Sequence, residues 1–431
     1  MPSQDPENPI PPGANVAVIG AGIAGITAAH LLSQKHRVTL FEKNHYLGGH
    51  TNTILIERGP DQGLPVDTGF IVYNDRNYPN FIRLLEDLHI VGQPSDMSFG
   101  FSSHRPDFEY SSFVPGGLLA QPANLFNPVF HAMVRDILKF NRCAVTDLEA
   151  HRLNGRTLGH YLDELKLGEA FLNYYLIPMG SAIWSTPLKE MFQFPAQSFV
   201  RFFLNHGLLA LKGRPHWLTI PGGSQRYVQA FRSRFTGEVV LNTQLAAVIR
   251  DAAGVTVLEK NGGKRRFDYA ILATHADEAL ALLGDPSPEE SILLGAWEYT
   301  RNTAVLHTDI SAMPRRKKAW ASWNYMLQDP LDAEAPVSLT YHMNRLQRLD
   351  ADQEYFVTLN RHAPFPQETI HKTIHYTHPK YTLKSLRSQA ELPGLNGVRR
   401  TFFCGSYCGY GFHEDGVVAA LRAVSAFGVS L

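Results

Sequence analysis

The chain has 431 residues, of which 44% are hydrophobic and 19% charged, a composition typical of a globular protein with more than one core. Forty basic residues balance forty acidic ones, and the lack of a basic surplus argues against a nucleic-acid partner. The three cysteines show neither a disulfide framework nor metal-ligand spacing with histidine, which predicts a reducing, cytoplasmic compartment and no metal site.

The start of the chain is polar and rich in proline, which predicts a disordered lead-in over residues 1–14. It lacks the positively charged segment followed by an apolar segment that is typical of a secretory signal. No later segment approaches the ~20 apolar residues that a membrane-spanning helix needs.

A nucleotide-binding pattern follows over residues 16–49. Residues 16–19 predict a buried parallel strand, residues 23–34 a helix and residues 38–41 a second strand. The turn between the first strand and the helix has G-x-G-x-x-G spacing, in Gly20, Gly22 and Gly25. Such glycines permit a tight turn, a close approach of pyrophosphate and close packing of the helix, whose free N–H groups favour phosphate.

Three further features extend this pattern. Glu42 ends the second strand at about the ~20-residue offset of the acid that binds a ribose hydroxyl. The pair Gly48 and Gly49 lets the backbone run close to phosphate or ribose. Residues 66–72 predict a strand in which Gly69 marks a close approach.

Residues 16–49 and 66–70 together resemble the FAD-binding opening of the flavin amine oxidase and phytoene desaturase superfamily. The resemblance implies an α/β fold, with a Rossmann-like FAD-binding domain of the GR2 type and an interleaved α+β substrate domain. His50 stands where that superfamily usually has Arg, a stronger ligand for phosphate. The Ser-Gly-Gly-Cys context of a covalent flavin link is absent, so we expect non-covalent FAD.

The middle of the chain predicts helices over residues 76–90, 128–141, 157–165 and 169–177. Residues 192–211 are unusually apolar and aromatic. Two interpretations stay open for them: a buried helix of the second domain, or an apolar tunnel wall or membrane-docking face.

The chain then returns to the first domain and leaves it again. We expect a helix over residues 225–235, strands over 239–241, 255–258 and 267–274, and a hairpin at 261–263. Four later segments should pair as a sheet: 303–308, 320–326, 337–341 and 355–359. The basic run 315–318 is either a solvated loop or a contact for an anionic headgroup.

The last forty residues predict a strand and loop over 401–405, a glycine-rich loop over 406–415 and a helix over 416–427. This arrangement resembles the superfamily's C-terminal flavin motif, in which a helix N-terminus points at the flavin ring. Ser406 occupies a position where the family often has an acid.

These segments predict a domain order. Residues 15–75, 215–285 and 396–431 should form the FAD-binding domain, whereas 76–214 and 286–395 should form the helical and sheet parts of the substrate domain. The residues expected to contact FAD are Gly20, Gly22, Ile23, Ala24, Gly25, Glu42, Lys43, Gly48, Gly49, His50, Thr51, Gly69, Phe70, Val240, Gly405, Ser406, Glu414, Asp415, Gly416 and Val417.

Catalytic candidates lie in the loop before the last helix. His413 could move a proton, although a helix-capping or phosphate-facing role is the alternative, and Tyr410 could form a wall of the substrate site. Because His413, Glu414 and Asp415 are adjacent, they do not converge on one metal ion. Lys317 and Lys318 lie in the wrong local context for the lysine of amine-oxidising relatives, which favours desaturation or double-bond isomerisation.

Across almost its full length the chain resembles the FAD/NAD-binding oxidoreductases associated with cyclopropane fatty acid synthases, through the segments VIGAGIAG, LGGHTNT, VDTGFIVYN, AWASWNY and CGYGFHEDG. The resemblance implies an acyl-lipid or other apolar substrate. Peripheral membrane contact stays open, through the apolar segment 192–211 or the basic run 315–318. Two alternatives stay open: a flavin amine oxidase acting on a small amine, and a non-catalytic flavoprotein scaffold for a lipid-modifying enzyme partner.

Overall fold

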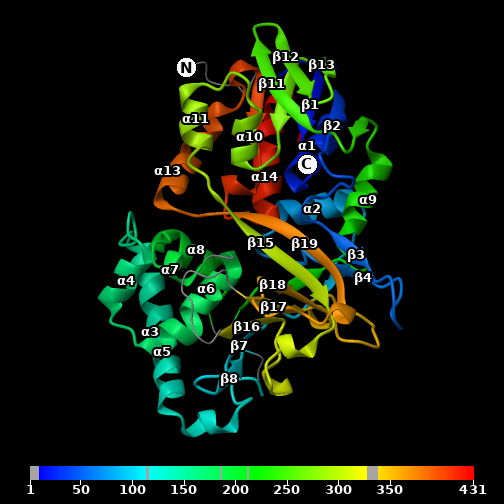
Figure 1. Cartoon of the computed structure of the whole chain (residues 1–431). Helices are drawn as coiled ribbons and strands as arrows, with labels where there is room; N and C mark the ends of the chain where they lie inside the picture. The colour runs from blue at the N-terminus through cyan, green and yellow to red at the C-terminus, as the bar shows by residue number, and fades with distance from the viewer. Residues whose placement is uncertain (1–8, 113–115, 185–186, 211–212, 328–337) are drawn as a thin grey trace.

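The computed structural model describes residues 9–112, 116–184, 187–210, 213–327 and 338–431. Figure 1 shows a domain built around a parallel sheet at one end of the molecule and a lobe of helices and mixed sheet at the other. Two long strands, β15 (Tyr299–His307) and β19 (Ile370–Pro379), run side by side across the middle and join the two parts.

The parallel sheet confirms the predicted nucleotide-binding unit. Its strands have the order β10-β2-β1-β14-β20, and every neighbouring pair is parallel. Helix α1 (Ile23–Leu32) leaves the first strand and packs against α14 (His413–Val424). The strands are β1 (Asn15–Ile19), β2 (Arg37–Phe41), β10 (Glu238–Val240), β14 (Tyr269–Leu272) and β20 (Thr401–Phe403).

A three-stranded antiparallel sheet extends this domain, formed by β11 (Leu245–Asp251), β12 (Gly254–Glu259) and β13 (Lys264–Phe267). The prediction of one strand over 267–274 is wrong, because the chain changes sheets at Asp268. There the Asp268 carboxylate accepts the N–H of Asn15 at 2.7 Å, while the N–H of Asp268 donates to the carbonyl of Asn15 at 2.8 Å. Strand β11 was not predicted.

The large sheet has the order β19-β15-β18-β17-β16-β7-β8 and is antiparallel except between β16 and β7. It confirms that the four later segments pair, although Val337 lies outside the described residues. Strands β7, β8 and β19 were not predicted. The remaining strands are β7 (Phe99–Ser103), β8 (Phe108–Ser111), β16 (Trp323–Leu327), β17 (Leu339–His342) and β18 (Phe356–Leu359).

The helical lobe contains α3 (Pro128–Glu149), α4 (Leu158–Leu165), α5 (Glu169–Phe171), α6 (Ile177–Trp184), α7 (Leu188–Met191) and α8 (Ala196–Asn205). The helix predicted over residues 169–177 continues to Trp184, because a π-helical turn (Leu172–Leu176) connects α5 to α6. In α8, Phe199, Phe202 and Phe203 are buried, so this part of the apolar segment forms core.

Smaller elements complete the fold: α2 (Pro79–Asp87), α9 (Gln225–Arg234), α10 (Ala276–Leu282), α11 (Pro288–Leu294), α12 (Met343–Leu346), α13 (Leu383–Glu391), β3 (Thr53–Leu55), β4 (Pro65–Asp67), β5 (Val72–Asn74), β6 (Gln93–Pro94) and β9 (Trp217–Thr219). Strands β3 and β4 pair with each other, and β5, β9 and β6 form a third small sheet.

Several boundaries differ from the predictions. The single strand predicted over residues 66–72 is wrong, because β4 ends at Asp67 and β5 begins at Val72. Helix α3 continues to Glu149 rather than ending at residue 141. Helix α2 begins at Pro79 rather than at residue 76, because Asn74 Oδ1 accepts the N–H groups of Arg76 and Asn77 and forms a turn. Helix α14 begins at His413 rather than at residue 416. Residues 9–14 are not disordered, since the N–H of Ile10 donates to the carbonyl of Ala426 at 2.8 Å; residues 1–8 lie outside the description.

Candidate functional site

The turn between β1 and α1 is shaped to admit a ligand at one glycine and to pack tightly at another. A Cβ on Gly22 would meet no atom within 4 Å, so this side of the turn is open. A Cβ on Gly25 would lie 1.8 Å from the carbonyl oxygen of Gly20, so helix and strand tolerate no side chain there. Gly20 itself has φ +97°, a backbone conformation that favours glycine.

Glu42 lies where β2 ends, and its buried carboxylate is held by the backbone. Oε2 accepts the N–H of Ala21 at 2.9 Å, and Oε1 accepts the N–H of Asn44 at 2.9 Å. A carboxylate offers about four acceptor sites, so two remain for hydroxyl donors. The glycine turn and the acid are thus joined directly.

The segment with the glycine pair crosses the same turn. The N–H of Gly48 donates to the carbonyl of Ala21 at 2.8 Å, and a Cβ on Gly49 would lie 3.2 Å from the Cα of Gly22. Gly69 approaches this segment from the other side, where a Cβ would lie 2.2 Å from the carbonyl oxygen of His50. The structure therefore brings three predicted glycine sites together.

The N-terminus of α14 lies against the N-terminus of α1. A Cβ on Gly416 would lie 2.7 Å from Cγ2 of Ile23. Asp415 caps α14 by accepting the N–H of Phe412 at 2.9 Å, and burial raises the pKa of its carboxyl group to about 6. The positive ends of two helix dipoles consequently converge on one region, which favours an anionic ligand.

Glu414 points elsewhere, to the start of α2. Its carboxylate accepts the N–H and the side-chain amide of Asn80 at 3.1 and 2.7 Å, and the N–H of Phe81 at 2.9 Å. It therefore satisfies the free donors at the N-terminus of α2 and ties that helix to α14.

His413 is buried at the first position of α14. Its Nε2 lies 3.0 Å from Oγ1 of Thr51 and 3.4 Å from the hydroxyl of Tyr227, and its ring stacks on Phe70 with centroids 3.5 Å apart. Burial lowers the pKa of His413 to about 3. The ring is therefore neutral at physiological pH, where it fixes the position of Thr51 rather than carrying a positive charge.

Asp67 is a buried hub that the sequence did not reveal. Its carboxylate accepts the hydroxyl of Thr53 at 2.5 Å, the N–H and hydroxyl of Ser224 at 2.8 to 3.0 Å, and the amide of Gln347 at 3.1 Å. Burial raises the pKa of Asp67 to about 6. The hub fixes the loop that carries Gly69 against two other segments of the chain.

A group of neutral histidines lies where the two parts of the protein meet. The ring of His50 stacks on Tyr376 at 4.8 Å and lies 5.3 Å from His378 and 6.2 Å from His275. Burial, followed by the neighbouring histidines, lowers the pKa of His50 well below its usual value, and burial lowers that of His378 to about 4. Nε2 of His50 is buried and has no hydrogen-bond partner among the described residues.

An aromatic wall connects the helical lobe to the loop before α14; it consists of Trp184, Phe202, Tyr410 and Phe412. Phe202 of α8 stacks on Phe412 with centroids 4.9 Å apart and meets Trp184 at 4.9 Å and Tyr410 at 6.3 Å. Tyr410 and Phe412 are only half-buried. They therefore present aromatic surface beside the convergent helix N-termini.

The remaining predicted contacts are placed as follows. Lys43 is largely exposed and pairs with Glu278 at 2.5 Å. The carbonyl of Val240 accepts the N–H of Glu42 at 2.9 Å, so β10 lies beside the acid. The carbonyl of Gly405 accepts the N–H of Cys408 at 3.1 Å, and Ser406 begins a short 3₁₀ turn. Ala24 and Val417 are buried in the contact between α1 and α14.

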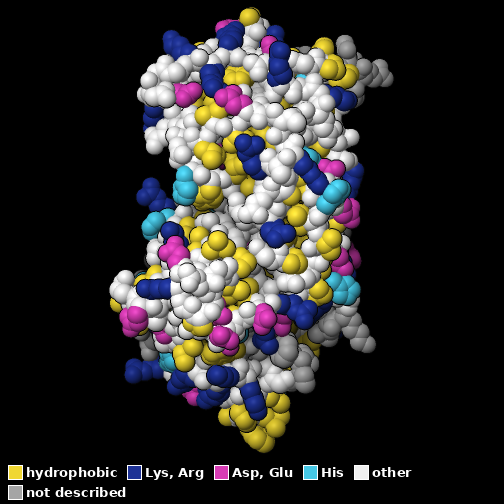
Figure 2. All heavy atoms as spheres, turned by 90° about the vertical axis from the view of Figure 1, so that its right-hand side faces the viewer, with side chains coloured by type: hydrophobic (Ala, Val, Ile, Leu, Met, Phe, Trp, Pro, Cys, Tyr) yellow, Lys and Arg dark blue, Asp and Glu magenta, His cyan; other side chains and the backbone are white. Residues whose placement is uncertain are grey.

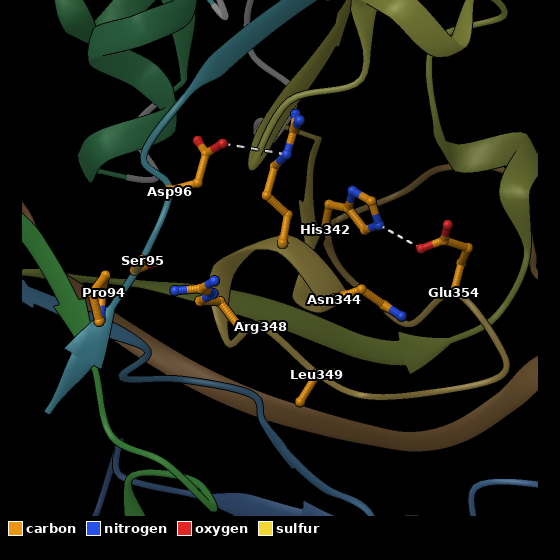
Figure 3. Close-up of a pocket in the computed structure, with 9 residues that line it drawn as sticks. Pro94, Ser95, Asp96, His342, Asn344, Arg348, Leu349 and Glu354 are labelled. Atoms are coloured by element: carbon orange, nitrogen blue, oxygen red, sulfur yellow. Dashed lines mark hydrogen bonds and ion pairs between the residues drawn. The ribbon is translucent and has the colours of Figure 1, made fainter.

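A separate cavity of about 560 Å³ opens on the large sheet, and none of the predicted site residues line it. Figure 3 shows that its polar side chains pair with one another, with His342 Nε2 2.6 Å from Glu354 and Arg345 Nε 3.3 Å from Asp96. The lining residues are Pro94, Ser95, Asp96, His342, Asn344, Arg345, Arg348, Leu349 and Glu354.

The sequence analysis missed several residues of the site, namely Thr53, Asp67, Ser224, Tyr227, Gln347, Tyr376 and His378. Tyr376 and His378 lie on β19, which its enrichment in β-branched and aromatic residues could have revealed. Asp67 and Ser224 carry no comparable local signal, because their partners are far away in the sequence.

The geometry fits the expected FAD. Gly22 leaves room for a pyrophosphate, Glu42 retains acceptor capacity for ribose, and His50 offers a buried ring nitrogen without a partner. Within the described residues, no three His, Cys, Asp or Glu side chains are placed to hold a metal ion. Over the same residues, no helix has the length and hydropathy to cross a bilayer.

Comparisons with known proteins point the same way. The profile of the family described as flavin containing amine oxidoreductase matches residues 23–308. The chain is 25% identical over 346 residues to a Mycobacterium tuberculosis protein provisionally named flavin-containing monoamine oxidase AofH, covering 77% of this chain and 71% of that protein. It is 28% identical over 317 residues to carotenoid phi-ring synthase of Streptomyces griseus, covering 68% and 57%.

Solved structures share the fold. The CLA-producing fatty acid isomerase from P. acnes superposes with a TM-score of 0.67 at 15% identity, over 99% of this chain and 100% of that one. Putrescine oxidase bound to putrescine gives a TM-score of 0.67 at 15% identity, over 96% and 98%.

Proposed function

We propose that the substrate of this protein is an apolar acyl chain. The premise is that the chain belongs to the flavin containing amine oxidoreductase family and is an FAD-dependent oxidoreductase. The net reaction would be desaturation or double-bond isomerisation. FAD, when bound, accepts a hydride at N5 of its ring system. The observation that carries the proposal is the aromatic wall from α6 and α8 to the loop before α14.

The aromatic wall suits a chain of methylene groups. Phe202 and Phe412 stack nearly parallel, at an interplanar angle of 22°, and Tyr410 adds a third ring. Tyr410 and Phe412 are the half-buried members of the wall, and their open surface would bind a lipid-like ligand through the apolar area removed from water, with the buried Phe202 and Trp184 as backing. The hydroxyl of Tyr410 would give this surface one polar group to orient the substrate.

The histidine group favours a neutral substrate over a cationic amine. His50, His275 and His378 all have lowered pKa values, mainly because they are buried, so these three rings are neutral at neutral pH. Glu278, a neighbouring carboxylate on α10, already pairs with Lys43 at 2.5 Å. A protonated amine would have to lose its hydration there without a charged partner.

The chain's own residues have three roles in this proposal. Gly22, Glu42 and the N-terminus of α14 hold the cofactor. His413 and Tyr227 fix Thr51 beside it. The aromatic wall excludes water and orients the substrate, which is the main requirement for transfer between two bound partners.

Two relatives support a lipid-like substrate. One shares the fold and is titled a CLA-producing fatty acid isomerase, and the other is named a carotenoid phi-ring synthase. The provisional monoamine oxidase and putrescine oxidase keep an amine as the rival substrate.

The test is anaerobic mixing of the FAD-loaded protein with unsaturated fatty acids, phospholipids and a panel of primary and secondary amines. The expected result is that a fatty acid or phospholipid bleaches the flavin absorbance, or that its acyl chain is converted. Phe412→Ser should weaken both while leaving bound FAD unchanged, and Ile310→Ser, at a position that is 60% exposed, serves as the control. Bleaching with amines alone, followed by peroxide release once air is admitted to reoxidise the flavin, would replace the proposal by an amine oxidase. Inert flavin with every substrate would leave the scaffold alternative.

A further inference from the structure

We propose that the protein docks on anionic lipid bilayers through an apolar tip at the end of the helical lobe. The apolar tip consists of Leu118, Leu119, Leu125, Phe126 and Val129, which lie before and at the start of α3. This inference goes beyond the proposed reaction and does not depend on it, because vesicle binding can be measured without turnover.

The exposure of the apolar tip is unusual. Phe126 is 84% exposed and Leu125 is 51% exposed, and the other three side chains also count among the exposed large hydrophobic residues. Figure 2 shows hydrophobic side chains gathered at the end of the molecule that lies opposite the parallel-sheet domain. Contiguous exposed apolar surface of this kind marks an interaction site in a folded protein.

The apolar tip is held in place rather than frayed. Nε2 of His131 bonds the carbonyl of Leu125 at 2.7 Å, and the side chain of Asn127 caps α3 by accepting the N–H of Val129 at 2.9 Å. The buried amide of Asn124 donates to the carbonyl of Glu109 at 2.9 Å and so fixes this segment on β8. Phe126 is therefore presented to solvent by an ordered turn.

The charge pattern around the apolar tip selects a bilayer with anionic headgroups. Residues 110–134 contain no Asp, Glu, Lys or Arg. Basic residues follow at once, with Arg135 and Arg142 exposed on α3. A side chain of Phe or Leu can enter the acyl region only if no charge accompanies it, and cations beside it gain from anionic lipid.

The basic run 315–318 lies on the same side, because it packs on β8. Arg315 and Arg316 pair with Asp107, and Arg316 also pairs with Glu109 at 3.0 Å, so two cations of the run are already neutralised. Asp136, beside Arg135 on α3, is buried: one oxygen accepts the N–H of Gly168, and the other lies 3.3 Å from Nε of Arg135, whose side chain stays 75% exposed. Lys317 and Lys318 extend the positive border beyond these pairs.

A second copy of the chain fits the apolar tip less well than a bilayer does. A stable dimer buries about 800 Å² on each partner, whereas these side chains occupy a narrow protruding end. Contact between two tips would also bring the basic borders of both copies together, which is repulsive.

The test is flotation of the FAD-loaded protein with vesicles of phosphatidylcholine alone or mixed with phosphatidylglycerol. The protein should float with the mixed vesicles, less with phosphatidylcholine, and less at high salt because charge attraction is screened. The double variant Leu125→Ser/Phe126→Ser should lower partitioning at least tenfold. Arg135→Gln should lower it only on the anionic vesicles.

Ile292→Ser is the matched control, since Ile292 is 66% exposed on α11, which Figure 1 shows at the opposite end of the molecule, and its replacement should leave flotation unchanged. Flavin absorbance and melting temperature report that each variant is folded. Failure of the wild-type protein to float would overturn the proposal. So would equal flotation of the double variant, or a dimer that the double variant dissociates.

Discussion

Replacing Glu42 by Gln tests the core of the cofactor site. Each carboxylate oxygen accepts one backbone N–H, from Ala21 and from Asn44, both at 2.9 Å, and the side chain is only 5% exposed. A glutamine keeps the size but has one oxygen, so its NH₂ group must face one of two N–H donors. One buried donor then loses its partner, which should destabilise the apoprotein by about 1–3 kcal/mol.

The same change removes a charge-assisted hydrogen bond to the ribose. Such bonds contribute about 1.5–3 kcal/mol, so FAD should bind roughly 10- to 150-fold more weakly. Urea unfolding of the apoprotein measures the first effect, and quenching of FAD fluorescence measures the second. Glu57→Gln, at an exposed carboxylate, is the control. Unchanged FAD affinity in Glu42→Gln would refute the ribose assignment, and unchanged unfolding would refute the backbone network.

Three further predictions follow from named contacts. Gly22→Ala should weaken FAD binding without unfolding the apoprotein, because its Cβ meets open space. Gly25→Ala should fail to fold, because its Cβ would meet a backbone carbonyl at 1.8 Å. Flavin absorbance measures bound FAD, and circular dichroism measures folding. Arg250→Ala should cost about 3–5 kcal/mol in urea unfolding, since it leaves Glu290 buried without the guanidinium that bonds both its oxygens, and Arg250→Met with Glu290→Leu should recover much of that loss. His413 has a pKa of about 3 in the fold and about 6.5 when unfolded, so it contributes stability above about pH 6.5 that is lost as the pH falls toward 3. His413→Gln should therefore make the unfolding midpoint fall less steeply at acid pH. An unchanged pH dependence would show that the ring is not buried as described.

Local sequence determined the nucleotide-binding unit, because each part of it is encoded by neighbouring residues. An apolar run forms β1, three glycines form the turn, and Glu42 follows the next strand at a fixed offset. Within such a unit the contacts are short-range, so spacing alone predicts the position of Glu42 beside Ala21. The start of α14 was predicted three residues too late, since its cap depends on the folded loop before it.

Contacts between distant segments were not predictable in the same way. Asp67 becomes a hub only because Ser224 and Gln347 reach it from more than 150 residues away. Tyr376 and His378 enter the site on β19, whose pairing with β15 spans the two domains. No periodicity along the chain encodes such a meeting, because it depends on how the completed sheets pack.

Two phenylalanines show the same difference between what the sequence determines and what the tertiary structure decides. Phe202 and Phe126 both stand in apolar stretches; the sequence analysis singled out only the stretch around Phe202, and left open whether it is core or surface. The structure buries Phe202 in the aromatic wall and leaves Phe126 exposed at the apolar tip. Sequence alone determined which segments avoid water, since hydrophobicity is a property of each residue. Only the tertiary structure decided which of them find a protein partner, since burial depends on every segment that packs around them.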